Sequence, residues 1–113
     1  PPRSTLFPYT TLFRSTQEYE FEDRTLAHLK VAITMKLRRQ ESFLMSWTNP
    51  AEKGGGRLSI WLTPSIPLVF RFAGSRSPDL NKHWLEVLNE LSNTPRGLIV
   101  VSEQDAAKHR AKA

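Results

Sequence analysis

Hydrophobic and polar residues alternate in several short stretches of the chain, with the period of two that is typical of half-buried β-strands. In residues 17–22, for example, Tyr19 and Phe21 alternate with glutamates. A further stretch, 98–101, is apolar almost throughout and predicts a short strand in the interior of a sheet. The alternating stretches are 17–22, 43–48, 58–63 and 68–73.

Two longer stretches place apolar residues at the spacing of an amphipathic helix. The first predicts a helix over 24–39, with Asp23 as its N-cap. The second predicts a helix over 78–92, because Ser77 suits the cap and Pro78 suits the first helical position. The apolar stripes are Leu26, Leu29, Ile33 and Leu37 in the first helix and Leu80, Trp84, Leu88 and Leu91 in the second.

The order β-α-β-β-β-α-β predicts the fold class α+β. Glycines at 54–56 and the prolines Pro64 and Pro67 give short connections between the three middle strands, which favours an antiparallel meander. We expect two layers, with an antiparallel or mixed sheet of about five strands and both helices on one face, because this arrangement buries both apolar stripes.

The two ends of the chain differ in character from its middle. Residues 5–15, TLFPYTTLFRS, resemble the in-frame translation of a sequencing-adapter oligonucleotide, so we expect residues 1–15 to be an artefactual leader. The alternative is a genuine β-rich N-terminus, since Leu12, Phe13 and other residues here suit strands. Residues 103–113 predict a disordered polar tail, and 16–102 a single domain.

Charge and cysteine content narrow the classes of function. Of the formal net charge of +5, two charges lie in residues 1–15 and one in 103–113, and the small remainder does not by itself indicate a nucleic-acid partner. The absence of cysteine excludes disulfides, a thiolate nucleophile and a cysteine-based zinc site, and it fits the reducing cytoplasm. No apolar run approaches the ~20 residues of a membrane span, so we expect no membrane partner.

Strand alternation predicts one face of the sheet as an interaction surface. If the leucines and phenylalanines of 58–63 and 68–73 face the core, Trp61 and Arg71 project from the opposite face, with Arg57 as a further candidate. Some proteins stack single-stranded nucleic acid on such a face. A protein partner or a second copy would also cover the tryptophan, and a cation–π pair at the surface is a third explanation.

Other polar groups give weaker indications. Lys36, Arg38 and Arg39 are candidate phosphate contacts, although cations at the end of a helix also offset its macrodipole and can simply remain solvated. His28 and His83 fall on different predicted helices without a third ligand, so we expect surface or boundary histidines and no metal site. The sequence contains no Gly-x-Ser-x-Gly motif and no phosphate-binding loop, so we expect no catalytic residue and no cofactor.

Two segments carry a resemblance to a known family. Residues 22–29 (EDRTLAHL) and 60–68 (IWLTPSIPL), within a wider similarity over 17–103, resemble a family of small actinobacterial domains of unknown function. Proteins of that family sometimes bear the name ATP-dependent DNA ligase. Such a ligase attacks the α-phosphate with the lysine of a Lys-x-Asp-Gly motif, and no lysine of this chain begins one.

Together these features predict a non-enzymatic cytoplasmic interaction domain that binds a protein partner or forms a homo-oligomer through a sheet face. The alternative is a DNA-associated accessory domain, which the name carried by the resembling family implies.

Overall fold

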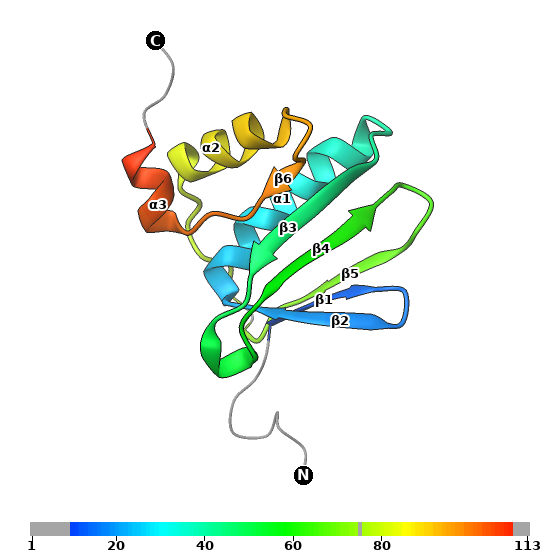
Figure 1. The fold of residues 1–113 in the computed structure, drawn as a ribbon, viewed down its shortest axis with the longest axis horizontal. Helices are drawn as coiled ribbons and strands as arrows, with labels where there is room; N and C mark the ends of the chain where they lie inside the picture. Colours follow the sequence, from blue (N-terminus) through cyan, green and yellow to red (C-terminus); the bar gives the residue numbers. More distant parts are fainter. Residues whose placement is uncertain (1–9, 75, 110–113) are drawn as a thin grey trace.

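The computed structural model describes residues 10–74 and 76–109. It has an α+β fold (Figure 1), which confirms the predicted class. The elements in chain order are β1 (Thr10–Arg14), β2 (Gln17–Phe21), α1 (Asp23–Arg38), β3 (Phe43–Thr48), the 3-10 helix η1 (Ala51–Lys53), β4 (Arg57–Leu62), β5 (Leu68–Arg71), α2 (Lys82–Ser92), β6 (Leu98–Ile99) and α3 (Glu103–Lys108).

The strands form two sheets of three strands each, with the orders β2-β1-β5 and β4-β3-β6. β3 and β4 form the predicted antiparallel hairpin, and β6 joins β3 in parallel. The meander is wrong at its third strand, because β5 pairs with β1 and not with β4. Residues Thr11–Arg14 of β1 pair with the whole length of β5. The strands therefore form two sheets instead of the single sheet that was predicted.

Five residues of the predicted leader form the strand β1. Thr10–Arg14 is the middle strand of its sheet, paired with β2 on one side and β5 on the other, and Leu12 is fully buried. Thr10, Thr11 and Leu12 are all buried, as expected for a strand with a neighbour on each side. The remainder of the predicted leader, residues 1–9, lies outside the described residues.

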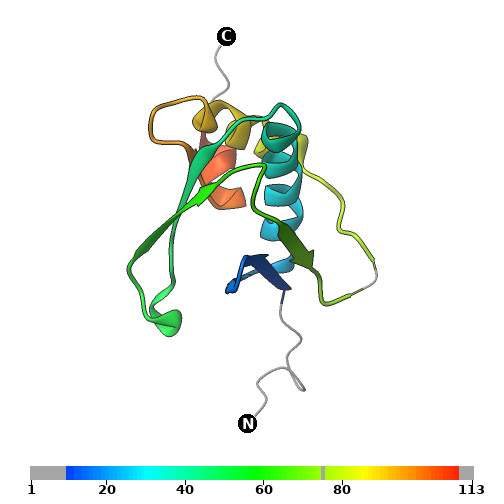
Figure 2. The same cartoon turned by 90° about the vertical axis from the view of Figure 1, so that its right-hand side faces the viewer.

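The helices lie together on one side of the β4-β3-β6 sheet, as the two perpendicular views show (Figures 1 and 2). The hydrophobic core fills the space between the helices and the sheets. Leu26, Leu29 and Ile33 of α1 have no exposed surface, and they join inward-facing residues of both sheets, such as Leu12 and Met45, in one buried cluster. Within the described residues, no helix is both long and apolar enough to span a membrane.

Both long helices begin at residues other than those predicted. α1 starts at Asp23, one residue early, and the Asp23 carboxylate accepts a hydrogen bond from the Thr10 hydroxyl of β1 instead of capping the helix. α2 starts at Lys82, because Asn81 is its N-cap and its side chain accepts a hydrogen bond from the Trp84 amide at 3.1 Å. Residues 77–81 therefore run as an irregular segment between the sheet and α2.

Residues 103–108, predicted as part of a disordered tail, form the helix α3. Ser102 is the N-cap and accepts from the Asp105 amide at 3.0 Å, while Ala106 is buried. Nε2 of His83, in α2, lies 2.9 Å from the carbonyl oxygen of Ala106 and 3.1 Å from that of His109. These contacts attach α3 to α2, which local composition did not reveal. The end of the predicted tail, residues 110–113, lies outside the described residues.

The ring of His28 is fully buried, which corrects its predicted place at the surface. Its Nδ1 donates to the carbonyl of Arg24 at 2.7 Å, and its Nε2 accepts from the amide of Asn81 at 2.8 Å, so the two bonds together define a neutral tautomer. The ring also stacks on Trp84, with centroids 4.3 Å apart. His28 is thus a structural residue that attaches the segment before α2 to α1.

A salt bridge beside His28 attaches α3 to α1. Nε and Nη2 of Arg24 donate to the two carboxylate oxygens of Glu103 at 2.8 and 2.7 Å, and Nδ2 of Asn81 donates to the same carboxylate at 2.8 Å. The bonds from Arg24, and then that from Asn81, lower the pKa of Glu103 from 4.5 to about 2. A bidentate pair of this kind also fixes the angle between the two helices.

The low pKa of Glu103 predicts a specific loss of stability in acid. Because the folded-state pKa lies below the unfolded value of 4.5, the contribution of Glu103 is fully present above that value and is lost as the pH falls toward 2. We expect Glu103→Gln to lower the free energy of unfolding at pH 6 and to converge with the wild type near pH 2. Urea unfolding at several pH values measures this, with the exposed Glu86→Gln of α2 as the matched control. A constant difference across the pH range would contradict the assignment.

Gly97 allows β6 to approach β3. Its φ is +78°, and a Cβ at this position would lie 2.3 Å from the carbonyl oxygen of Leu44. We expect Gly97→Ala to lower the free energy of unfolding by at least about 2 kcal/mol, since backbone strain and a backbone clash combine. Gly56→Ala is the matched control, because Gly56 has a φ of +82° but open space around it, and the cost there is about 1 kcal/mol. Equal losses for the two variants would show that the clash relaxes.

Candidate functional site

The outward side of the β4-β3-β6 sheet carries the exposed tryptophan of the protein. In β4, Ile60 and Leu62 are buried while Arg57 and Trp61 are exposed, which is the predicted alternation. Trp61 is 51% exposed, whereas Trp47 and Trp84 are 8% and 2% exposed. Trp61 and Arg57 therefore project from the same side of one strand, the side away from the helices.

Cross-strand pairing adds β3 and β6 to this surface, which we call the outer face. It consists of the outward residues of β4, β3 and β6. The Oγ atoms of Ser46 and Ser59 are hydrogen-bonded at 2.7 Å in its middle, and Ile99 of β6 lies beside Ser46. The outer face therefore changes from apolar at one end, through hydroxyl groups, to cationic at the other. The opposite pairs of β3 and β4 are Leu44 and Trp61, Ser46 and Ser59, and Thr48 and Arg57.

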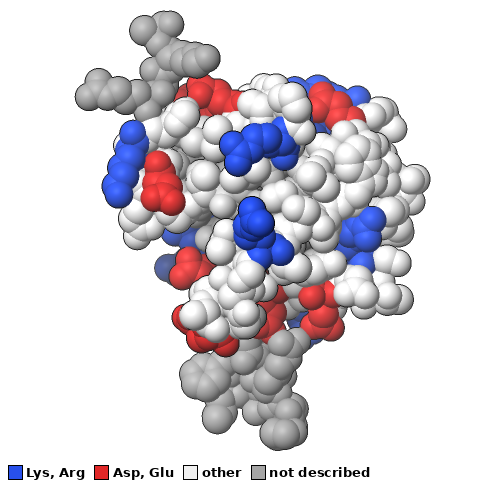
Figure 3. Space-filling view, in the orientation of Figure 1, with Lys and Arg blue, Asp and Glu red and all other residues white. Residues whose placement is uncertain are grey.

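An open hollow of about 840 Å³ lies over the polar part of the outer face. Arg57 lines it from β4 and Arg96 from the turn before β6, and Asp105 of α3 is its one acidic lining residue among those described. Neither arginine makes an ion pair with any residue that the structure describes. Figure 3 shows Lys and Arg side chains in the middle of this side of the molecule and acidic groups nearer the rim. The hollow is thus suited to a negatively charged group.

Arg71 does not belong to the outer face, which corrects the predicted grouping of Trp61, Arg71 and Arg57. It lies on β5, directly opposite Thr11 of β1, and so on the other sheet. No cation–π pair joins it to Trp61 within the described part of the chain. The link near Trp61 comes instead from Arg14 of β1, whose Nε donates to the Trp61 carbonyl oxygen at 2.7 Å and so connects the two sheets.

The three cations at the end of α1 do not form a shared anion site. Lys36 is buried, and its Nζ donates to Oε1 of Glu41 at 2.9 Å and lies 5.5 Å from the centroid of the Phe43 ring. Arg39 pairs with the other oxygen of Glu41 at 3.0 Å. Lys36, and then Arg39, lower the pKa of Glu41. Of the predicted phosphate contacts, only Arg38 is exposed without a described acidic partner.

The outer face presents hydroxyl, guanidinium and indole groups, and the histidines His28 and His83 are engaged in other contacts. In residues 10–74 and 76–109, no group of three or more histidine and acidic side chains is placed to hold a metal ion. Both ring nitrogens of His28 are engaged in structural bonds, and Nε2 of His83 contacts backbone carbonyls of α3. Hydroxyl, guanidinium and indole groups remain, and these recognise a partner by hydrogen bonds, charge and apolar contact.

The sequence pattern predicts some residues of the outer face and does not predict others. The outward positions of β3 follow from the same alternation that placed Trp61, and the antiparallel hairpin then brings the two strands together. Arg96 stands in a turn, Pro95-Arg96-Gly97, outside any periodic stretch, so no pattern pointed to it. It reaches the outer face only because β6 pairs in parallel with β3.

Comparison with known proteins gives a match to a family model. No curated protein and no solved structure matches the chain. A family model described as a domain of unknown function, DUF7882, matches residues 10–103, a range that begins with β1 and ends at the first residue of α3. The chain therefore belongs to the DUF7882 family of domains of unknown function.

Proposed function

We propose that this protein is a non-enzymatic interaction domain that binds an acidic segment of a partner protein on its outer face. One observation carries the proposal: two exposed arginines without described ion-pair partners, Arg57 and Arg96, share an open sheet surface with the exposed Trp61. Tryptophan and arginine are the residue types that most often dominate the energy of protein interfaces. The lack of cysteine also fits a cytoplasmic location, which we include in the proposal.

The polarity of the outer face supports a partner with both apolar and acidic groups. Leu44 and Trp61 provide an apolar contact at one end, and Arg57 requires an acidic counterpart at the other. Since β4 is extended, these two groups lie on one line with Ser59 between them. An extended partner chain that runs along β4 meets all three when the side chains on its facing side are apolar at one end and acidic at the other.

The same charges oppose pairing of two copies through this face. A twofold dimer would bring the arginines of both copies to one interface, where like charges in a desolvated contact repel each other. An acidic partner neutralises them instead. We therefore expect the protein to be a monomer in solution, and light scattering during size-exclusion chromatography measures this. A dimer that Trp61→Ala dissociates would assign the outer face to a second copy of the chain.

Single-stranded nucleic acid is the second candidate, because an aromatic residue and an arginine on one open sheet surface can stack a base and hold its phosphate. The DNA-associated accessory role implied by the resembling family would act in this way. We expect an oligonucleotide of fifteen thymidines, if bound, to quench the exposed Trp61, with an affinity that falls steeply as salt rises. No quenching at low salt removes this candidate.

Charge reversal tests the proposed acidic partner. We use a fluorescently labelled peptide with phenylalanines in one half and glutamates in the other and measure its anisotropy with the full chain. The double variant R57E/R96E should weaken binding at least about tenfold, because two favourable charge contacts become repulsive. Arg38→Glu, an exposed reversal on α1, is the matched control and should leave binding unchanged. Equal binding by the wild type and the double variant would contradict the proposal, as would no binding to the wild type.

Truncation of the tryptophan tests the apolar end of the same face. We expect Trp61→Ala to weaken the binding of the peptide about 30-fold, which corresponds to the loss of an anchor worth about 2 kcal/mol. The thermal unfolding temperature should change little, since half of the side chain is already exposed. Val69→Ala, which removes an exposed apolar side chain from the other sheet, is the control. If both substitutions weaken binding equally, the peptide does not use the outer face.

A further inference from the structure

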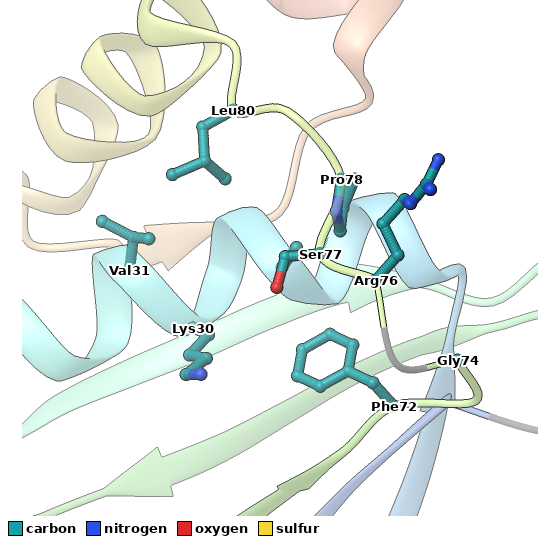
Figure 4. Close-up of a pocket in the computed structure, with 9 residues that line it drawn as sticks. Lys30, Val31, Phe72, Gly74, Arg76, Ser77, Pro78 and Leu80 are labelled. Carbon is teal, nitrogen blue, oxygen red and sulfur yellow. The ribbon is translucent and has the colours of Figure 1, made fainter.

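A second hollow, of about 310 Å³, lies between α1 and the segment that joins β5 to α2 (Figure 4). None of its lining residues belongs to the outer face. Its volume falls at the lower end of the range for small-molecule sites, about 300–1,000 Å³. It is therefore large enough for a small metabolite-sized molecule and too small for a folded partner.

The walls of this hollow are mainly apolar. Val31 of α1 and Leu80 of the connecting segment point toward one another across it, and Phe72 and Pro78 lie along the other side (Figure 4). Leu80 is 48% exposed, an unusual place for a leucine within the predicted apolar stripe of α2. It is exposed because α2 begins only at Lys82. An apolar molecule in the hollow would cover this surface.

The end of the connecting segment next to α2 is attached to α1 beside the hollow. Nη1 of Arg24 donates to the carbonyl of Asp79 at 2.9 Å, and the Asn81 amide donates to Nε2 of His28 at 2.8 Å. Both bonds come from α1, which also forms the opposite wall. Such preorganisation spares a ligand the cost of ordering its own site.

The charges around the hollow are positive. Lys30 of α1 and Arg76 of the connecting segment are both exposed lining residues, and the lining contains no acidic side chain among the described residues. Nζ of Lys30 lies 5.8 Å from the centroid of the Phe72 ring, close to the apolar wall. The nearby Asp79 interacts electrostatically with Arg24. The hydrogen bonds of Arg24 to Glu103, and then the charge of Asp79, raise the pKa of Arg24. Ser77 turns its hydroxyl toward the hollow (Figure 4).

We propose that this hollow binds a small organic carboxylate with an apolar body. The apolar part packs between Val31, Phe72 and Leu80, and the carboxylate lies at the side of Lys30, where an ammonium and the Ser77 hydroxyl can donate to it. A neutral apolar molecule would gain no charge-assisted hydrogen bond from these donors. The inference does not depend on the proposed function, because the two sites have no residue in common.

Octanoate and its neutral analogue octanamide are the probes that test the role of charge. Both are titrated into the full chain and followed by two-dimensional NMR of the amide and methyl groups. We expect octanoate to shift the signals of Val31, Phe72 and Leu80 with a Kd on the order of 1 mM or below. Octanamide should bind at least about tenfold more weakly. Equal affinities, no octanoate binding, or shifts confined to the outer face would each overturn the proposal.

Two variants assign the binding to this hollow. Lys30→Met keeps the apolar stem and removes the charge, so it should reduce octanoate affinity about tenfold and leave octanamide affinity unchanged. Lys82→Met, at an exposed lysine outside the hollow, is the matched control. Ala27→Leu, which adds volume to the α1 wall, should abolish binding of both probes while the remaining spectrum reports an intact fold. Unchanged octanoate binding in Ala27→Leu would place the ligand elsewhere and overturn the proposal.

Discussion

The bonds that α1 makes to residues late in the chain hold much of this structure in its observed arrangement. Arg24 donates two hydrogen bonds to the carboxylate of Glu103, and His28 accepts a hydrogen bond from the amide of Asn81. The segment before α2 has no regular structure of its own, and α3, with six residues, is too short to be stable as an isolated helix. The segment before α2 therefore depends on α1, and α3 depends on both α1 and α2. These two elements in turn form one wall of the small hollow and the Asp105 side of the outer face.

The division of the strands into two sheets decides which surfaces remain available. The helices cover only one side of the β4-β3-β6 sheet, so the other side meets solvent and carries hydroxyl, guanidinium and indole groups. The antiparallel pair of β3 and β4 tolerates one solvated side, which fits the polar residues found there. The candidate site thus occupies the surface that packing leaves uncovered, and the core on the opposite side holds it rigid.

Local patterns in the sequence predicted α1, the β3–β4 hairpin and the exposure of Trp61, because each is decided by spacing within a few residues. The partner of β5, the burial of His28 and the place of Arg96 depend on residues distant in the chain, and no local pattern contains that information. Helix α2 shows a conflict between two local signals, Ser77-Pro78 and Asn81, and a bond to α1 favours the second. For α3, the Ser-x-x-Asp pattern at Ser102 and Asp105 was a valid start signal that the polar composition outweighed.

The position of β1 has a consequence for how freely this part of the chain can vary. A strand with a neighbour on each edge is held by main-chain amides and carbonyls, which every residue except proline supplies in full. Side-chain identity then matters at Leu12, which fills the interior, at Thr10, which bonds to Asp23, and at Arg14, which bonds to the Trp61 carbonyl. The remaining positions of β1 can therefore change without loss of either strand pairing, because the main chain alone supplies the bonds to β2 and β5.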